Sequence, residues 1–342
     1  MGRGVSRYGI VDRNTPITTS VKETAGGLPA VISAWKHGVS KMGFVGSTVS
    51  LGRANQKRGF DCPGCAWPDP KHRSPFEYCE NGAKAVSDEA TIKTIPDSFW
   101  QEHSIHALGR KSDQWLNSQG RLSRPLILER DSNHYVPSDW DRAIGIIAKS
   151  LDALEDPNDA YFYTSGRASN EAAYLWQLLA RQYGTNNLPD CSNMCHESSG
   201  VALNESIGIG KGTVRLEDFD KADLIVIVGQ NPGTNHPRML SALKSAKKSG
   251  ASVLSINPLK ETGMRRFRHP QSPIDMLGAG TQISDDHVSI KINGDMALFR
   301  AIGSIILDKG SHDLDFINLN TTGFLDYAKI AQKIDWDLIE HL

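Results

Sequence analysis

The stretch DLIVIVGQNPGTNHPR at residues 223–238 decides the predicted fold. Its five consecutive aliphatic residues, Leu224 to Val228, are typical of a strand that is buried on both faces, as in a parallel sheet. A turn containing Gly229 and Gly233 follows, and a helix is expected from about Pro237, because proline suits the first helical turn. A buried strand that leads through a turn into a helix indicates an α/β fold.

The alternation of strands and helices continues on both sides of this stretch. We expect a cap at Ser138 for the first long helix and a stop at Gly184 for the second. Two short strands are expected within residues 120–136. The other expected strands lie at 160–163, 251–256 and 287–292, and the expected helices at 138–154, 170–183, 237–248, 295–307 and after His196. This order predicts a parallel sheet covered by helices on both faces.

Composition and charge exclude several classes of protein. The 342 residues include 38 Lys and Arg against 39 Asp and Glu, which argues against nucleic-acid or anionic-membrane binding by bulk charge. The longest strongly apolar run, residues 224–228, is far shorter than the ~18 residues of a membrane helix. The first residues show neither the apolar core nor the paired arginines of an export signal. We therefore expect a cytoplasmic protein without a membrane span.

Changes in amino-acid composition along the chain predict three segments. Residues 1–40 are expected to be a polar leader. Residues 41–137, rich in Gly, Pro, Trp and His, are expected to form a loop-rich module that needs a ligand to hold it together. Residues 138–342 are expected to form the α/β domain.

Three of the five cysteines cluster in the loop-rich segment, at Cys62, Cys65 and Cys79. A Cys-Pro-Gly-Cys turn presents two thiolates to one metal, and a third thiolate from the next loop would add to the site. This spacing serves zinc or a [4Fe–4S] cluster, and both prefer four ligands. His72 or Asp69 could be the fourth ligand. The alternatives are a reduced cysteine pair without a metal and a redox-active cysteine pair.

The other two cysteines, Cys191 and Cys195, lie in GTNNLPDCSNMCHESSG, residues 184–200. We expect Cys195 and His196 at a loop-to-helix junction, where the helix N-terminus favours thiolate. Cys195 is then a candidate nucleophile or metal ligand, and His196 a candidate proton acceptor. The alternative is a buried structural cysteine beside a surface histidine.

The turn at Gly229 to Arg238 lies where open parallel sheets bind phosphates. Asn257 and Pro258 repeat the arrangement after the next strand. The turn matches neither the GxGxxG nor the Walker pattern, which disfavours NAD and simple ATP binding. The basic run that follows, residues 260–268, is better explained as a solvated charge run.

These segments together resemble the molybdopterin oxidoreductase family, in the branch of formate-dehydrogenase-like alpha subunits. The resemblance extends from about residue 25 to the end. It is carried by FDCPGCAWPDP, YCENGAKA, GRLSRPLI with YVPSDWDRAI, TSGRASNEA, GTNNLPDCSNMCHESSG, VGQNPGTNHPR, INPLKETG and FINLNTTGF. Each motif is weak alone, but their order and spacing are specific.

The resemblance implies a molybdenum bis(molybdopterin guanine dinucleotide) cofactor and a [4Fe–4S] cluster. It places Cys195 as the molybdenum ligand and His196 beside it as a catalytic residue, and it assigns Cys62, Cys65 and Cys79 to the cluster. The residues it implies for cofactor binding are Gly229, Asn231, Pro232, Gly233, His236, Arg238, Asn257 and Lys84. The implied reaction is a two-electron oxidation of formate or a similar small molecule. The electrons would leave through the cluster to an unidentified acceptor protein.

The chain departs from the family's pattern at three places. Pro68-Asp69-Pro70 stands where the family has a further cluster cysteine, so the resemblance does not imply four thiolates here. Asn81 stands where formate dehydrogenases place a lysine between cluster and pterin, and Lys84 is the nearest substitute. The chain is also shorter than family members, which implies an N-terminal part with an incomplete α/β domain that could be inactive alone.

Two other classes of function remain open from the residues. One is a non-catalytic, zinc-stabilised binding module. The other is a metal-free thiol enzyme that uses Cys195 and His196.

Overall fold

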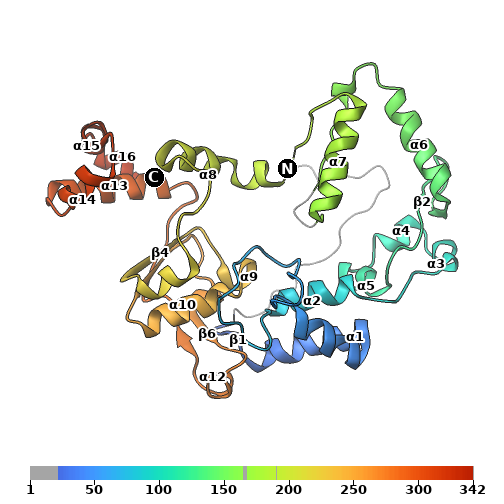
Figure 1. The fold of residues 1–342 in the computed structure, drawn as a ribbon, viewed down its shortest axis with the longest axis horizontal. Coiled ribbons are helices and arrows are strands. Elements are labelled where there is room, and N and C mark those ends of the chain that lie inside the picture. The colour runs from blue at the N-terminus through green and yellow to red at the C-terminus, as the bar shows by residue number, and fades with distance from the viewer. Residues whose placement is uncertain (1–21, 165–167, 190, 342) are drawn as a thin grey trace. The chain divides into compact units, whose positions relative to one another are not determined.

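The computed structural model describes residues 22–164, 168–189 and 191–341 (Figure 1). The chain divides into two compact units, each assembled from separate stretches of sequence. We call residues 20–36, 51–83 and 215–342 the sheet unit, and residues 37–50 and 84–214 the helical unit, as far as they are described. The predicted boundary at residue 40 falls inside the first long helix, α1 (Gly27–Arg53), which contributes to both units.

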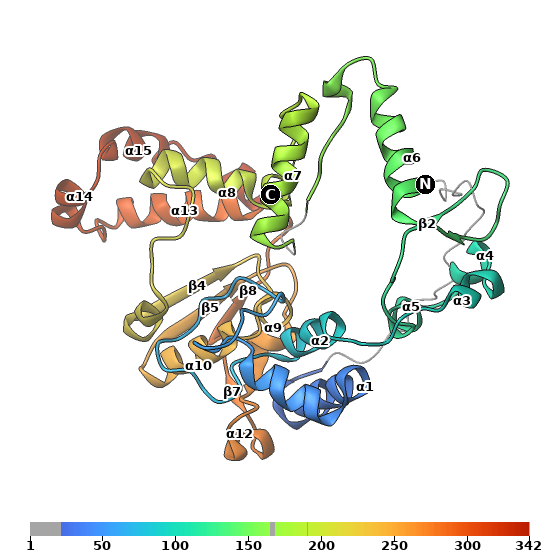
Figure 2. The same cartoon turned by 45° about the vertical axis from the view of Figure 1, so that its right-hand side comes forward.

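The sheet unit contains the predicted parallel sheet. Strand β4 (Leu224–Val228) pairs in parallel with β5 (Ser252–Ile256), which pairs in parallel with β8 (Asp286–Val288), as Figure 2 shows. A smaller sheet joins β1 (Ala25–Gly26), β6 (Arg266–Arg268) and β7 (Thr281–Gln282). The helices of this unit are η2 (Leu216–Lys221), α9 (Pro232–Asn235), α10 (Met239–Lys248), α11 (Thr262–Arg265), α12 (Pro273–Leu277), α13 (Asp295–Asp308), α14 (Leu314–Asn320), α15 (Phe324–Ala331) and α16 (Trp336–His341). The mixed α/β class with a parallel sheet is confirmed.

The core of the sheet unit lies on one side of β4. Ile227 packs there with residues from α10, β5, α11 and β6, namely Met239, Leu240, Leu243, Val253, Met264, Phe267 and Ile283. Alternate side chains of a strand point to opposite faces, and Leu224 and Val226 are 58% and 40% exposed. In the described residues this face of β4 therefore lacks the helical cover that the sequence predicted.

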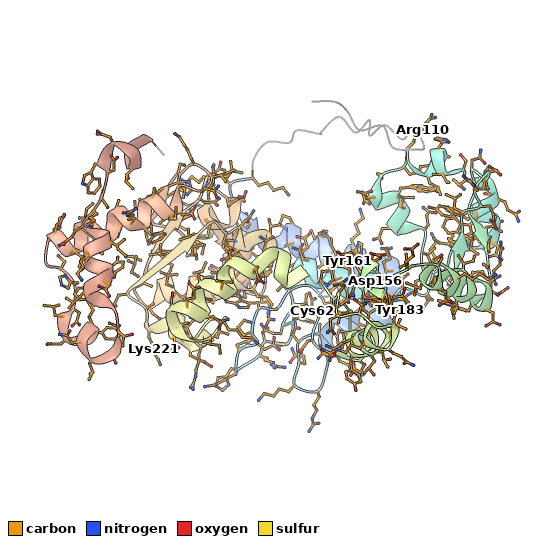
Figure 3. The ribbon with its side chains drawn as sticks, turned by 90° about the horizontal axis from the view of Figure 1, so that it is seen from above. Cys62, Arg110, Asp156, Tyr161, Tyr183 and Lys221 are labelled. Carbon is orange, nitrogen blue, oxygen red and sulfur yellow. The ribbon has the colours of Figure 1, made fainter. Side chains whose placement is uncertain are left out.

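The helical unit contains α6 (Trp140–Asp152) and α7 (Asn170–Tyr183), with a small core of Ala160, Phe162 and Ala180. The hydroxyl of Tyr183, labelled in Figure 3, donates a 2.7 Å hydrogen bond to the carbonyl of Leu151. The elements that lie in this unit, or begin in the other and end in it, are α2 (Glu80–Glu89), α3 (Asp97–Glu102), α4 (Ile105–Leu108), α5 (Asp113–Ser118), β2 (Leu126–Ile127), β3 (Val136–Pro137), α6 (Trp140–Asp152), η1 (Pro157–Asp159), α7 (Asn170–Tyr183) and α8 (Cys191–Ile207). The two short strands expected in this region are present as β2 and β3, and they pair antiparallel.

Several helix ends match the sequence and others do not. Gly184 ends α7 in the left-handed conformation, as predicted. The predicted cap at Ser138 is wrong, because Asp139 caps α6 by accepting a 2.7 Å bond from the Arg142 amide. The helix expected after His196 begins earlier, at Cys191.

Two further predictions concern the strand expected at 160–163 and the helix expected from Pro237. The strand expected at 160–163 is absent from the described residues, because this segment packs against α7, with a bond from the Phe162 amide to the Asn187 carbonyl. The helix expected at 237–248 is confirmed as α10, which begins two residues later at Met239, and the short helix α9 precedes it with His236 in a non-helical conformation. Among the described helices, none is both long and apolar enough to cross a bilayer.

Candidate functional site

The three clustered cysteines lie in the connection between α1 and α2, where Figure 3 labels Cys62. Cys62 is buried, and Cys65 and Cys79 are half-buried. Asn55, in the left-handed conformation, anchors this connection. Its Oδ1 accepts from the Cys62 amide at 2.8 Å, while its Nδ2 donates to the Glu77 carbonyl at 2.7 Å and to Cys62 Sγ at 3.5 Å. Sequence reasoning missed Asn55, although asparagine tolerates this conformation better than most residues.

Two glycines leave room between the thiols. A Cβ on Gly82 would lie 3.0 Å from Cys62 Sγ and 3.6 Å from Cys79 Sγ, and a Cβ on Gly64 would lie 3.2 Å from Gly82 Cα. The Gly82 amide also donates to Cys79 Sγ at 3.3 Å. N–H donors to cysteine sulfurs tune the thiolates that hold iron–sulfur clusters. The glycine-lined space and its donors therefore fit a thiolate-bound cluster.

The three thiols also act on one another electrostatically. Burial raises the pKa of the Cys79 thiol, bonds from the Gly82 and Asn81 amides oppose this, and the charges of Cys62 and Cys65 raise it further. Burial thus favours the neutral form of the Cys79 thiol, and a metal that bound there would displace its proton. In the described parts of the chain, no three His, Cys, Asp or Glu side chains are arranged to hold a single metal ion.

The two candidates for a fourth ligand have different surroundings. Both oxygens of Asp69 are engaged, Oδ1 by Arg238 at 2.7 Å and Oδ2 by Arg73 at 3.1 Å. His72 is exposed and lines a cavity of about 460 Å³ together with Trp67. Asp69 is thus part of an ion-pair network in this structure.

Arg238 is the centre of that network. Its side chain is 10% exposed, and Nη2 lies 2.7 Å from Asp69 Oδ1 and 2.9 Å from Glu77 Oε1. Burial acts to lower the pKa of Arg238, but the bonds and charges of these carboxylates outweigh it and raise the pKa. We predicted Arg238 as a cofactor ligand from the sequence. In this structure its guanidinium binds Asp69 and Glu77 in the connection that carries the cysteines, and its role toward a cofactor stays a prediction.

Two more contacts join the cysteine connection to the turn after β4. Asn81, two residues after Cys79, donates from Nδ2 to the Thr234 carbonyl at 2.8 Å. The ring of Trp67 lies 6.3 Å from that of His236 and makes an edge contact with Phe219, with centroids 5.7 Å apart. The predicted cluster residues and the predicted nucleotide turn are therefore neighbours within the sheet unit.

The ends of β4 and β5 lie side by side at this turn. Gly229 has a positive φ of 62°, and its amide donates to the Ile256 carbonyl at 2.9 Å. Asn257 follows β5, is buried, and donates from Nδ2 to the Leu259 carbonyl at 2.7 Å. Open α/β sheets bind ligands at the carboxyl ends of their parallel strands. Gly229 and Asn257 lie at this edge of the sheet, where a cofactor is expected.

The short helix α9 is fixed by close packing. Asn231 donates from Nδ2 to Glu261 Oε2 at 2.8 Å, and Pro232 is fully buried at the first helical position. A Cβ on Gly233 would lie 3.1 Å from Gly263 Cα. The close backbone approach that Gly233 permits is therefore made by α11. Because α9 has four residues, its dipole is too short to hold an anion in the way a long helix would.

The remaining predicted residues belong to the helical unit. Lys84 is half-buried in α2. His196 is exposed in α8, whereas the side chain of Cys195 lies outside the described part of the structure. Because α8 begins at Cys191, Cys195 lies in its second turn and not at the predicted helix start.

Comparison with protein families gives one match that covers most of the chain. The family described as molybdopterin oxidoreductase matches residues 121–334. The chain belongs to the molybdopterin oxidoreductase family. Membership supports an oxidoreductase with a molybdenum–molybdopterin cofactor, and the resemblance read from the sequence is confirmed.

Relatives of this family member include proteins with and without a stated activity. An uncharacterized oxidoreductase of Mycobacterium tuberculosis is 49% identical over 325 residues, covering 93% of this chain and 42% of that protein. Protein YdeP of Escherichia coli is 44% identical over 334 residues, covering 94% and 44%. Formate dehydrogenase H of Escherichia coli is 28% identical over 227 residues, covering 65% and 29%. The chain thus spans less than half the length of these relatives.

A solved structure with a similar fold is acetylene hydratase from Pelobacter acetylenicus. Its TM-score is 0.50 at 18% sequence identity, and the match covers 65% of this chain and 28% of that one. This likeness concerns the fold alone.

Proposed function

We propose that this chain is the part of a formate-dehydrogenase-like molybdenum oxidoreductase that holds an iron–sulfur cluster and one side of a bis(molybdopterin guanine dinucleotide) cofactor. The observation that carries the proposal is the hydrogen bond from Asn81 Nδ2 to the Thr234 carbonyl. It joins the residue just after the last clustered cysteine to the turn where the resemblance expects the nucleotide end of the cofactor. An electron leaving the cofactor would then meet the cysteine site next.

Each group of residues has a distinct proposed role. Cys62, Cys65 and Cys79 would hold the cluster, and the strand-end residues Gly229 and Asn257 would bind the nucleotide end of the cofactor, with Lys84 as a further contact. When bound, the molybdenum cofactor accepts two electrons from a small substrate, formate or a similar molecule. The proposal keeps the segment boundaries at residues 40 and 137 and a cytoplasmic location.

The proton of the substrate is assigned to His196. His196 is exposed in α8, and a neutral imidazole nitrogen is a common proton acceptor in catalysis. Cys195 would hold the metal next to it through Sγ. An acceptor protein would take the electrons from the cluster side.

Elemental analysis and an anaerobic visible spectrum of the purified chain test the proposal. We expect molybdenum and iron, with broad sulfur-to-iron absorption that dithionite bleaches. Zinc without iron or molybdenum would favour a zinc-stabilised binding module and overturn the proposal. Absence of all three metals, together with loss of activity on thiol alkylation, would favour a metal-free thiol enzyme using Cys195.

A further inference from the structure

The connection that carries the cysteines contains two acidic residues between Cys65 and Cys79, namely Asp69 and Glu77. Asp69 stands in the stretch where the family resemblance expects a further cysteine, so it is the natural candidate for a fourth cluster ligand. Its two oxygens are divided between two guanidiniums, Oδ1 with Arg238 and Oδ2 with Arg73. A carboxylate so engaged has no oxygen left to give to iron without losing a partner.

Glu77 is engaged as completely as Asp69. Its Oε1 accepts from Arg238 Nη2 at 2.9 Å and from Nε at 3.2 Å. Its Oε2 accepts from the Ser74 amide at 3.0 Å and from the Ser74 hydroxyl at 2.9 Å. All four carboxylate oxygens of this stretch therefore have partners inside the protein.

Moving either carboxylate to an iron atom would be unfavourable. Arg238 is 10% exposed, and Asp69 and Glu77 are 16% and 15% exposed. A buried guanidinium that loses a partner keeps the cost of its desolvation without the compensating attraction. In addition, iron in clusters prefers soft thiolate sulfur to hard carboxylate oxygen. The ion-pair network and the ligand preference of iron thus both disfavour a bond between iron and Asp69 or Glu77.

We propose that the iron–sulfur site of this chain is held by three protein thiolates, Cys62, Cys65 and Cys79, and that its fourth iron has no protein ligand. The inference rests on the proposed function, because it presupposes a cluster. An iron atom without a thiolate binds an exchangeable small ligand such as water or hydroxide and is readily lost. On oxidation, [4Fe–4S]²⁺ would release one Fe²⁺ and pass one electron to the oxidant, leaving [3Fe–4S]⁺.

Two matched variants of one residue test the proposal. Each chain is reconstituted anaerobically with ferrous iron and sulfide, treated with ferricyanide as the electron acceptor, and followed by electron paramagnetic resonance and by chelation of released iron. The wild-type chain should release one iron per cluster and give a [3Fe–4S]⁺ signal, which ferrous iron with dithionite reverses. Asp69→Cys should release iron about tenfold more slowly, because a soft thiolate now binds the fourth iron. Asp69→Ala, which breaks the same ion pairs without adding a thiolate, should behave as the wild type.

Three other variants test whether another residue of the chain binds the fourth iron. His72→Ala, Cys191→Ala and Cys195→Ala, made separately, should leave iron release and the oxidised signal unchanged. If the wild-type cluster keeps its fourth iron in ferricyanide and one of these variants loses it, that residue is the ligand and the proposal is wrong. Retention of four irons in every variant also overturns it. Failure of all chains to take up iron, with molybdenum still bound, would instead remove the cluster from the proposed function.

Discussion

Arg238 Nη2 lies 2.7 Å from Asp69 Oδ1, although the two residues are 169 positions apart in the chain. Arg238 immediately precedes α10, and Asp69 lies between two of the clustered cysteines. The same nitrogen reaches Glu77, so one guanidinium ties both halves of the cysteine connection to the parallel-sheet core. The geometry of the thiols therefore depends on a residue that carries no sulfur and touches none of them.

Replacing Arg238 tests this dependence. Arg238→Met should lower the free energy of unfolding by about 3–5 kcal/mol, because two buried carboxylates lose their partner. Urea denaturation of the metal-free chain measures the change. Arg265→Met is the matched control, since its ion pair with Glu23 is largely exposed and should cost no more than about 1 kcal/mol. Equal effects of the two substitutions would contradict a buried network.

The contact between α9 and α11 makes a second prediction. A Cβ on Gly263 would lie 2.9 Å from Gly233 Cα, so Gly263→Ala should destabilise the chain by roughly 1–3 kcal/mol through overpacking. Gly52→Ala is the control, because nothing lies within 4 Å of its added Cβ near the end of α1. That substitution should be neutral or stabilise by up to about 1 kcal/mol. Thermal unfolding of both variants makes the comparison, and a stable Gly263→Ala chain would show that α9 and α11 are not in contact.

The pKa of Cys79 predicts how stability depends on pH. A thiol whose pKa is raised on folding contributes stability that is fully present below its ordinary value of 9.0 and lost as the pH rises through the folded value. The unfolding free energy of the metal-free wild type should therefore fall more steeply above pH 9 than that of Cys79→Ser. Parallel denaturation curves between pH 7 and 10 give the test. Identical slopes would mean that Cys79 is not buried beside the other thiols.

The molybdenum assignment makes a fourth prediction. In the molybdenum-loaded protein, Cys195→Ala should remove one sulfur from the metal's ligand shell in X-ray absorption and abolish turnover. His196→Gln should keep the metal but slow the proton-transfer step by on the order of 10²–10⁴-fold. Cys191→Ala is the control for Cys195 and should change the spectrum little. An unchanged sulfur count together with surviving activity in Cys195→Ala would return Cys195 to the role of a structural cysteine.

Sequence periodicity predicted the elements whose own side chains determine them. The aliphatic run at Leu224 to Val228 forms the predicted strand, although one of its faces is exposed, and Gly184 stops α7 because glycine readily adopts the required left-handed conformation. The choice between two neighbouring candidates for a helix cap was harder to predict. Ser138 and Asp139 both suit the position, and tertiary packing buries Ser138 and leaves Asp139 to accept from Arg142.

The site was predictable only in part, for a physical reason. Spacing identified Cys62, Cys65 and Cys79, since ligands on one tight turn are close in sequence. It could not show that Arg238 forms an ion pair with Asp69, because the two residues are 169 positions apart and meet only in the folded chain. The hydrogen bond from the Cys62 amide to Asn55 Oδ1 could not be predicted either, since it depends on a left-handed turn at Asn55 that the sequence alone does not reveal.

The interleaving of the two units has a consequence for biosynthesis. The cysteines leave the ribosome about 170 residues ahead of Arg238, and at ~5–20 residues per second this delay is on the order of 10–30 s. During that interval the thiols have no folded scaffold around them and are open to oxidation or to capture by stray metal ions. Contacts so distant along the chain also form slowly. If the chain holds the proposed cluster, its thiols need a reducing environment during this interval, and iron delivery would be productive only after translation has passed Arg238.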